Sequence, residues 1–161
     1  MNLEAFLQNR QQTSQTLTLV TGVFDVLHQE HRHFLEKAKQ TADLLLVGLE
    51  SDLRVRAMKG EGRPVNSALV RQKNLKRWGL ADFIFILPEQ FNKPEDHRRL
   101  IAEIKPDFMA VSSHSAFQQE KARILAEFNA KLLVVHDFNP EFSSTKSISK
   151  LAEQQRQSQK G

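Results

Sequence analysis

The sequence predicts a single-domain α/β protein with a doubly wound, five-stranded parallel sheet. Three observations lead to this fold class. Five short segments are almost continuously apolar, segments with helical spacing separate them, and polar segments follow several of the apolar runs. Short apolar strands that alternate with helices are typical of a parallel sheet covered on both faces. A chain of 161 residues is long enough for one domain with a hydrophobic core.

The elements follow from the apolar spacing, taken in chain order. Residues 1–16 are expected to form a short helix and a polar linker, residues 17–151 the main domain, and residues 152–161 a polar tail. The expected strands are Leu17–Thr21, Leu44–Leu49, Phe83–Leu87, Phe108–Val111 and Lys131–Val135. The expected helices are His31–Thr41, a short helix from Asp52, Ser67 to about Trp78, Pro94–Ile104, Ala116–Phe128 and a last helix from about Ser144.

Composition excludes several classes of protein. The absence of cysteine excludes disulfides and thiolate metal sites. The N-terminus does not have the pattern of a secretory signal, and no apolar stretch is long enough to span a membrane, so we expect a cytoplasmic protein. The net charge of +4 comes from basic residues interleaved with acidic ones. Nucleic acid is therefore an unlikely main partner.

The segment from Thr18 to Leu35 is the most informative part of the chain. A buried strand ends at Thr21-Gly22, and a helical pattern follows with His28 and His31 at its start. Residues three apart lie on the same side of a helical turn. Free backbone N–H groups and the positive end of the helix dipole favour a phosphate there. Two alternatives remain open from these residues, namely histidines that cap a helix and histidines that bind a metal.

Three blocks in this order resemble a known nucleotidyltransferase family. Residues 22–31 read G-V-F-D-V-L-H-Q-E-H and are similar to the signature G-x-F-D-x-x-H-x-G-H. Residues 51–66 and 142–146 resemble the family's second-strand loop region and its second phosphate motif. The resemblance covers about residues 17–151. It is closest to cytidylyltransferase-like enzymes such as the adenylyltransferases of heptose 1-phosphate and the cytidylyltransferases of glycerol 3-phosphate, and it implies a Rossmann-like fold.

The resemblance also implies an activity. The enzyme would transfer a nucleoside monophosphate, AMP from ATP rather than CMP from CTP, to a small phosphorylated sugar or polyol and release pyrophosphate, with Mg²⁺. The acceptor phosphate is already a nucleophile, so catalysis would consist mainly of positioning and charge stabilisation. Relatives are commonly homodimers, and residues 63–66 are where we expect the contact. The alternative is a non-catalytic nucleotide-binding or regulatory protein that retains the fold.

The resemblance assigns roles residue by residue. The expected catalytic residues are His28, His31 and Lys59. Besides the two histidines, the expected nucleotide contacts are Thr21, Gly22, Val23, Phe24, Ser143, Ser144, Thr145 and Lys146. The expected substrate contacts are Lys59, Arg63 and His114, and no metal ligand is assigned. Simpler interpretations remain open: a solvated basic loop at residues 59–63, a helix N-cap at residues 143–146, and an exposed histidine at position 114.

Several residues depart from the family pattern or remain ambiguous. Glu30 stands where the signature has glycine, and its charge would repel a triphosphate unless the side chain turns to solvent, pairs with Arg32 or Lys59, or is offset by Mg²⁺. We favour the turn to solvent. Asp25 could orient a histidine or cap the helix. The loop at residues 112–115 and the pair at residues 141–142 also differ from the relatives.

Overall fold

The computed structural model describes residues 1–136, and the expected second phosphate motif at residues 143–146 and the last expected helix lie outside them. The strands are β1 (Leu17–Gly22), β2 (Leu44–Leu49), β3 (Phe83–Ile86), β4 (Phe108–Ser112) and β5 (Lys131–His136). The helices are α1 (Leu3–Thr13), α2 (Gln29–Lys39), α3 (Asp52–Lys59), α4 (Ala68–Lys76), α5 (Pro94–Ile104) and α6 (Gln118–Glu127).

The strands form one parallel sheet in the order β3-β2-β1-β4-β5, which confirms the predicted fold class. The first strand lies at the centre, and the chain moves outward to β3 before it returns to β4 on the other side. The strand order therefore reverses between β1 and β4. Ligands of doubly wound sheets bind beyond the carboxyl ends of the strands at such a reversal.

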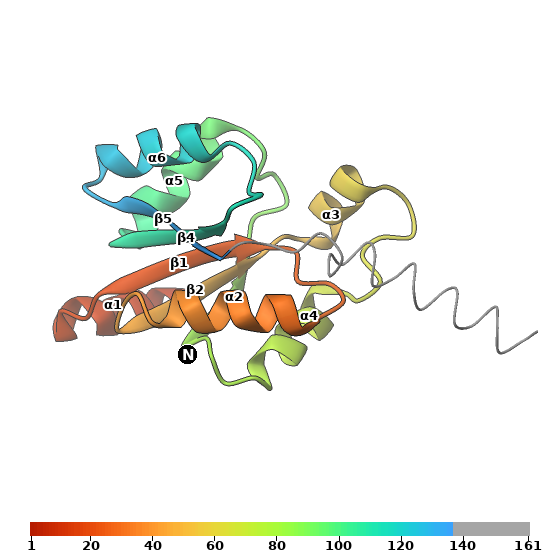
Figure 1. Ribbon diagram of the computed structural model, residues 1–161, viewed down its shortest axis with the longest axis horizontal. Helices are drawn as coiled ribbons and strands as arrows, with labels where there is room; N and C mark the ends of the chain where they lie inside the picture. The colour runs from red at the N-terminus through yellow and green to blue at the C-terminus, as the bar shows by residue number, and fades with distance from the viewer. Residues whose placement is uncertain (137–161) are drawn as a thin grey trace, which may run out of the picture.

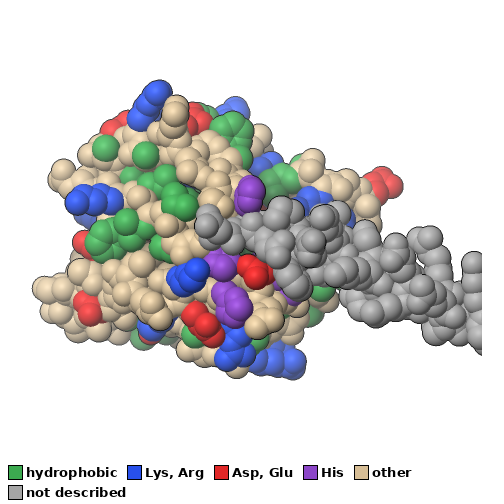
Figure 2. All heavy atoms as spheres, in the orientation of Figure 1, with side chains coloured by type: hydrophobic (Ala, Val, Ile, Leu, Met, Phe, Trp, Pro, Cys, Tyr) green, Lys and Arg blue, Asp and Glu red, His purple; other side chains and the backbone are tan. Residues whose placement is uncertain are grey.

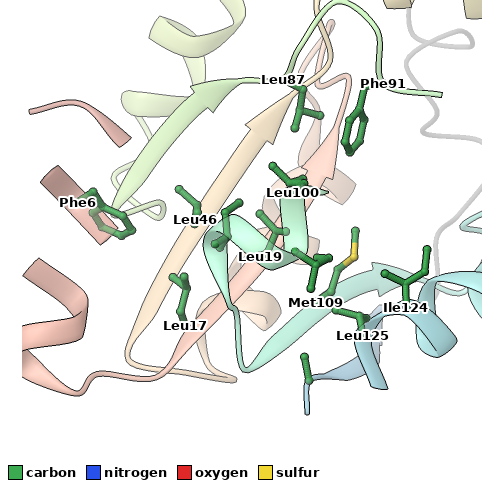
Figure 3. Packing of buried hydrophobic residues seen from close by; sticks show 13 residues of the cluster. Phe6, Leu17, Leu19, Leu46, Leu87, Phe91, Leu100, Met109, Ile124 and Leu125 are labelled. Atoms are coloured by element: carbon green, nitrogen blue, oxygen red, sulfur yellow. The ribbon is translucent and has the colours of Figure 1, made fainter. Parts of the chain in front are cut away.

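Helices lie on both faces of the sheet (Figure 1), and a hydrophobic core fills the space between the helices and the sheet on each face. Helices α1, α5 and α6 pack on one face, where Figure 3 shows the side chains of Leu17 and Leu19 among those of the helices. Helices α2 and α4 pack on the other face against Val20, Leu45 and Val47. Because successive side chains of β1 point to opposite faces, this central strand contributes to both cores.

All five strands begin at the residues predicted from the apolar runs, whereas the starts of α2, α4 and α6 differ from the prediction. Helix α4 begins at Ala68, because the predicted first residue Ser67 is its N-cap. Helix α2 begins at Gln29, not His31, because His28 has extended backbone angles and acts as the N-cap. Helix α6 begins at Gln118, since Phe117 is in the left-handed region with φ of 58°. Within residues 1–136, no helix is long and apolar enough to cross a membrane.

Candidate active site

A cavity of about 520 Å³ opens at the carboxyl edge of the sheet, where the strand order reverses. Its volume is in the range of small-molecule sites. Residues from β1, α2, α3, β4 and α6 and from the connecting loops meet there. They are Thr21, Gly22, Val23, Phe24, Glu30, His31, Phe34, Lys59, Ala110, Val111, Ser112, His114, Ser115, Ala116 and Lys121. The predicted residues 21–24, His31, Lys59 and His114 therefore share one cavity.

The turn after β1 brings backbone close to this cavity. Phe24 has φ of 49°, a left-handed conformation that is uncommon for a residue other than glycine. Its ring folds back over Gly22, where a Cβ atom would lie 2.7 Å from a ring carbon of Phe24. The same ring meets His31 edge to face, with 5.4 Å between centroids. A side chain at position 22 would therefore displace the Phe24 ring, which both packs in the core and contacts His31.

The two motif histidines stack on each other at the start of α2. Their ring centroids are 3.9 Å apart with an interplanar angle of 22°. The backbone N–H of His28 donates to Nδ1 of His31 at 3.4 Å, so the proton of the neutral His31 ring is assigned to Nε2. Burial lowers the pKa of His31 to about 3, with the neighbouring His28 as a second cause. Burial also lowers the pKa of His28. The pair therefore offers neutral N–H donors.

Two lysines reach the cavity from different helices. Lys59 ends α3, and burial followed by the charge of Arg63 lowers its pKa. Lys121 lies on α6, donates from Nζ to Ser115 Oγ at 3.1 Å, and also has a pKa lowered by burial. The carboxylate of Glu50 opposes that shift in Lys121, so the two charges interact. The cavity thus presents two cations that are partly removed from water, which strengthens their attraction for an anion.

Glu30 is held by a residue that the sequence did not suggest. Its Oε2 lies 2.5 Å from Nε2 of His136, the last residue of β5. The expected partner Arg32 pairs instead with Glu36 at 3.1 Å. The Glu30 side chain is only 16% exposed, so the favoured turn to solvent is wrong. Figure 2 shows that histidine side chains gather with acidic and basic ones on this face of the molecule.

Comparison with known proteins identifies the family. Residues 19–155 match the family described as cytidylyltransferase-like, which is most of the chain. The chain belongs to the cytidylyltransferase-like family. Membership agrees with the nucleotidyltransferase activity that the sequence motifs predict. The bifunctional protein HldE of Campylobacter jejuni subsp. doylei is 34% identical over 148 residues, and that of Helicobacter pylori strain G27 is 32% identical over 149 residues. Each alignment covers 92% of this chain and 30% of the relative, so the chain spans about a third of the length of these cytidylyltransferase-like relatives.

Solved structures support the fold of this cytidylyltransferase-like chain. The lipopolysaccharide core biosynthesis protein of Thermoplasma volcanium superposes with a TM-score of 0.62 at 22% identity, covering 78% of this chain and 99% of that protein. Pantothenate synthetase of Thermus thermophilus superposes with a TM-score of 0.56 at 16% identity, covering 78% of this chain and 57% of that enzyme. These likenesses concern the Rossmann-like architecture alone.

Asp25 has a role that neither sequence hypothesis included. Its carboxylate is fully buried and accepts from the backbone N–H groups of Val65 at 2.7 Å and Asn66 at 2.8 Å. The Asn66 amide donates back to the Asp25 carbonyl, and Arg63 Nε lies 3.4 Å from Asp25 Oδ2. Asp25 therefore fastens loop 63–66 to the turn after β1. Neither a cap of α2 nor the support of a histidine accounts for these contacts.

The predicted substrate residue Arg63 pairs with Asp25 and is not one of the residues that line the cavity. Its Nη2 is buried and has no hydrogen-bond partner among residues 1–136, so a substrate role stays a prediction. His28 is also outside the lining set and contacts the cavity through His31. Among the described residues, no group of three or more histidines and carboxylates could hold a metal ion, and a metal site therefore stays unassigned.

Three residues of this region were missed by sequence reasoning. Phe34 packs against the core and also lines the cavity, and Lys121 is one of many lysines scattered along the sequence. His136 directly follows the predicted strand Lys131–Val135, and the other polar segments of the site also follow strands. That placement was the available signal for His136. Nothing local distinguishes Lys121 from a solvated helix lysine.

The depressed pKa of His31 predicts a specific loss of stability in acid. The folded chain keeps this ring neutral down to a pKa of about 3, whereas the unfolded chain binds a proton below about pH 6.5. The contribution of the neutral His31 ring to the free energy of unfolding is therefore complete above pH 6.5. Below that pH it declines by up to about 1.4 kcal/mol per pH unit. Between pH 7 and 5, urea denaturation should show the wild type losing about 2 kcal/mol more than His31→Gln, which does not titrate. Parallel curves for the two proteins would contradict the assignment.

Proposed function

We propose that this chain is a sugar-phosphate nucleotidyltransferase. It joins AMP from ATP, in preference to CMP from CTP, to a small phosphorylated sugar or polyol. One observation carries the proposal. A stacked, neutral histidine pair at a helix N-terminus lies beside a glycine turn, at the strand reversal of a parallel sheet, with lysines on two other helices. Family membership and the resemblance to heptose 1-phosphate adenylyltransferases support the substrate class.

The proposed reaction needs little acid–base chemistry. An oxygen of the acceptor phosphate attacks the α-phosphorus of the triphosphate, the bond from that phosphorus to the bridging oxygen breaks, and pyrophosphate leaves. Charge develops on the phosphoryl oxygens, where N–H donors of His28 and His31 and the free N–H groups of α2 can stabilise it. Lys59 and Lys121, which both line the cavity, attract the acceptor phosphate and hold it in line.

Mg²⁺ belongs to the proposal as a companion of the triphosphate. It usually binds through substrate phosphates and keeps several waters, so a protein cage is not required. When bound, it neutralises charge on the phosphates. The residues at 143–146, outside the described part of the chain, are proposed to contact the β- and γ-phosphates. We also propose that the enzyme works in the cytoplasm.

Release of pyrophosphate tests the proposed function. The assay combines ATP or CTP and Mg²⁺ with a panel of acceptors that includes heptose 1-phosphate, hexose 1-phosphates and glycerol 3-phosphate. Each acceptor is matched with its unphosphorylated form. We expect release only with a phosphorylated acceptor and faster with ATP. Nucleotide binding without release across the whole panel would instead support the non-catalytic alternative, which none of the described residues favours.

We further propose a homodimer whose contact includes loop 63–66. Val65 in this loop is 55% exposed and Leu69 at the start of α4 is 70% exposed, although both are apolar. A two-fold dimer uses the same patch on both copies, so one substitution changes the contact twice. Sedimentation at about 50 µM, a concentration at which a standard-size interface persists, should show a dimer for the wild type and a monomer for Val65→Asp. A monomeric wild type would remove this proposal.

A further inference from the structure

The glutamate in place of the motif glycine lies in a connected polar group that joins α2 to β5. Glu30 and His136 are nearly covered, with side chains 16% and 8% exposed. The Nε2 of His136 lies 2.5 Å from Glu30 Oε2, and its Nδ1 lies 3.0 Å from Lys37 Nζ. Glu30 and Lys37 are seven residues apart on α2, while His136 is the last residue of β5. One imidazole therefore bridges two side chains on the same helix.

The hydrogen-bond roles in this group follow from the chemistry of its ends. A lysine ammonium can only donate, so Nδ1 of His136 accepts, and the proton of the neutral ring is on Nε2. A carboxylate can only accept, so Nε2–H donates to Glu30. The group therefore runs from the Lys37 ammonium through the neutral His136 ring to the Glu30 carboxylate, and the positive and negative charges balance. The bond from His136 is the largest cause that lowers the pKa of Glu30.

Glu30 lies where its carboxylate can affect the binding of an anionic ligand. Glu30 lines the same cavity as His31 and Lys59, in the first turn of α2. An unrestrained carboxylate there would compete with phosphate oxygens for the N–H groups of the helix start and would repel them. A carboxylate bonded to His136 at the end of β5 has its orientation restricted. A restrained glutamate can then occupy the glycine position without occupying the phosphate site.

We propose that His136 is a positioning residue that holds the Glu30 carboxylate against the end of β5 and so keeps the triphosphate part of the cavity open. This inference rests on the proposed function, because it assumes that a nucleoside triphosphate occupies the cavity. His136 need not touch the nucleotide. It acts through Glu30, and the same contact ties the start of the histidine-bearing helix to the sheet.

Two polar variants separate the two contacts of His136. Gln can place an N–H donor near the Nε2 position and so retain the bond to Glu30. Asn is shorter, so it can retain the contact with Lys37 and loses the bond to Glu30. Calorimetric titration with ATP in the absence of Mg²⁺ should give His136→Gln an affinity within about threefold of the wild type. His136→Asn should bind about tenfold more weakly, or about 1.4 kcal/mol.

The decisive variant removes the charge that His136 is proposed to restrain. Glu30→Gln alone should bind ATP within about threefold of the wild type, and the double variant Glu30→Gln/His136→Asn should bind as Glu30→Gln does. Equal affinities for His136→Asn and His136→Gln would overturn the proposal. A loss in His136→Asn that persists in the double variant would also overturn it, because His136 would then act on folding in general.

A measurement without ligand keeps this inference separable from the proposed function. If the wild type binds neither ATP nor CTP, the proposed function fails. The Glu30–His136 contact is then tested by urea denaturation of the wild type, Glu30→Gln, His136→Asn and the double variant. Non-additive changes in the midpoint would establish the contact, and additive changes would contradict it.

Discussion

Substitution of either motif histidine by alanine should lower the rate of pyrophosphate release by about 100- to 1,000-fold. His31 lines the cavity and His28 stacks on it, and both are proposed to donate to the phosphoryl group; loss of one such donor costs about 3–4 kcal/mol of transition-state stabilisation. Both rings are neutral near pH 7 because burial depresses their pKa values. The effect is therefore loss of an N–H donor and not loss of a net charge.

The geometry of the pair refines this prediction. The rings of His28 and His31 stack at 3.9 Å, so removal of one disturbs the other, and the double alanine variant should cost less than the product of the single effects. His31→Gln, which can place an amide N–H near the ring Nε2, should retain more activity than His31→Ala. His97→Gln is the matched control, since His97 packs on Phe91 and is not one of the residues that line the cavity, and its rate should change less than about twofold. Wild-type rates for both alanine variants would refute the catalytic assignment.

Replacement of Asp25 by alanine should cost about 3–5 kcal/mol of the free energy of unfolding. The carboxylate is completely buried and accepts two backbone N–H groups of loop 63–66, with Arg63 as an ion-pair partner. Removal of one member of a buried pair leaves the partner charge and the donors without compensation. Asp25→Asn should fall between alanine and the wild type, because its amide oxygen can accept one bond while its NH₂ group faces the second donor.

Urea denaturation measures this loss, with Glu36→Gln as the control. The ion pair between Glu36 and Arg32 is surface-exposed, so its removal should change stability by less than about 1 kcal/mol. A similarly small effect for Asp25→Ala would show that the buried network contributes no more than a surface pair. Activity should fall together with stability, since loop 63–66 closely follows Lys59 along the chain.

The buried cation Arg71 shows where local patterns stop being informative. Read as a sequence, it is one more basic residue after the second strand. In the fold it is fully buried, and it donates to the carbonyl of Val23 at 2.8 Å, to the carbonyl of Asn66 at 3.1 Å and to Asp52 at 2.8 Å. It therefore supports the turn after β1 and is not available to a substrate. Val23 and Asp52 are 48 and 19 residues from Arg71 along the chain, so helical or strand periodicity does not reveal these two contacts.

The sequence by itself determined the succession of strands and helices along the chain, the edge of the sheet at which the cavity lies, and the position of the two motif histidines at the start of a helix. These features follow from local physics, because apolar runs specify buried strands and a strand–turn–helix unit places polar residues beyond the carboxyl end of its strand. The tertiary structure alone decided the partners of Glu30 and Asp25 and the entry of Lys121 into the cavity. Glu30 and His136 are 106 residues apart, and only the packing of α2 against β5 brings a carboxylate and an imidazole into contact.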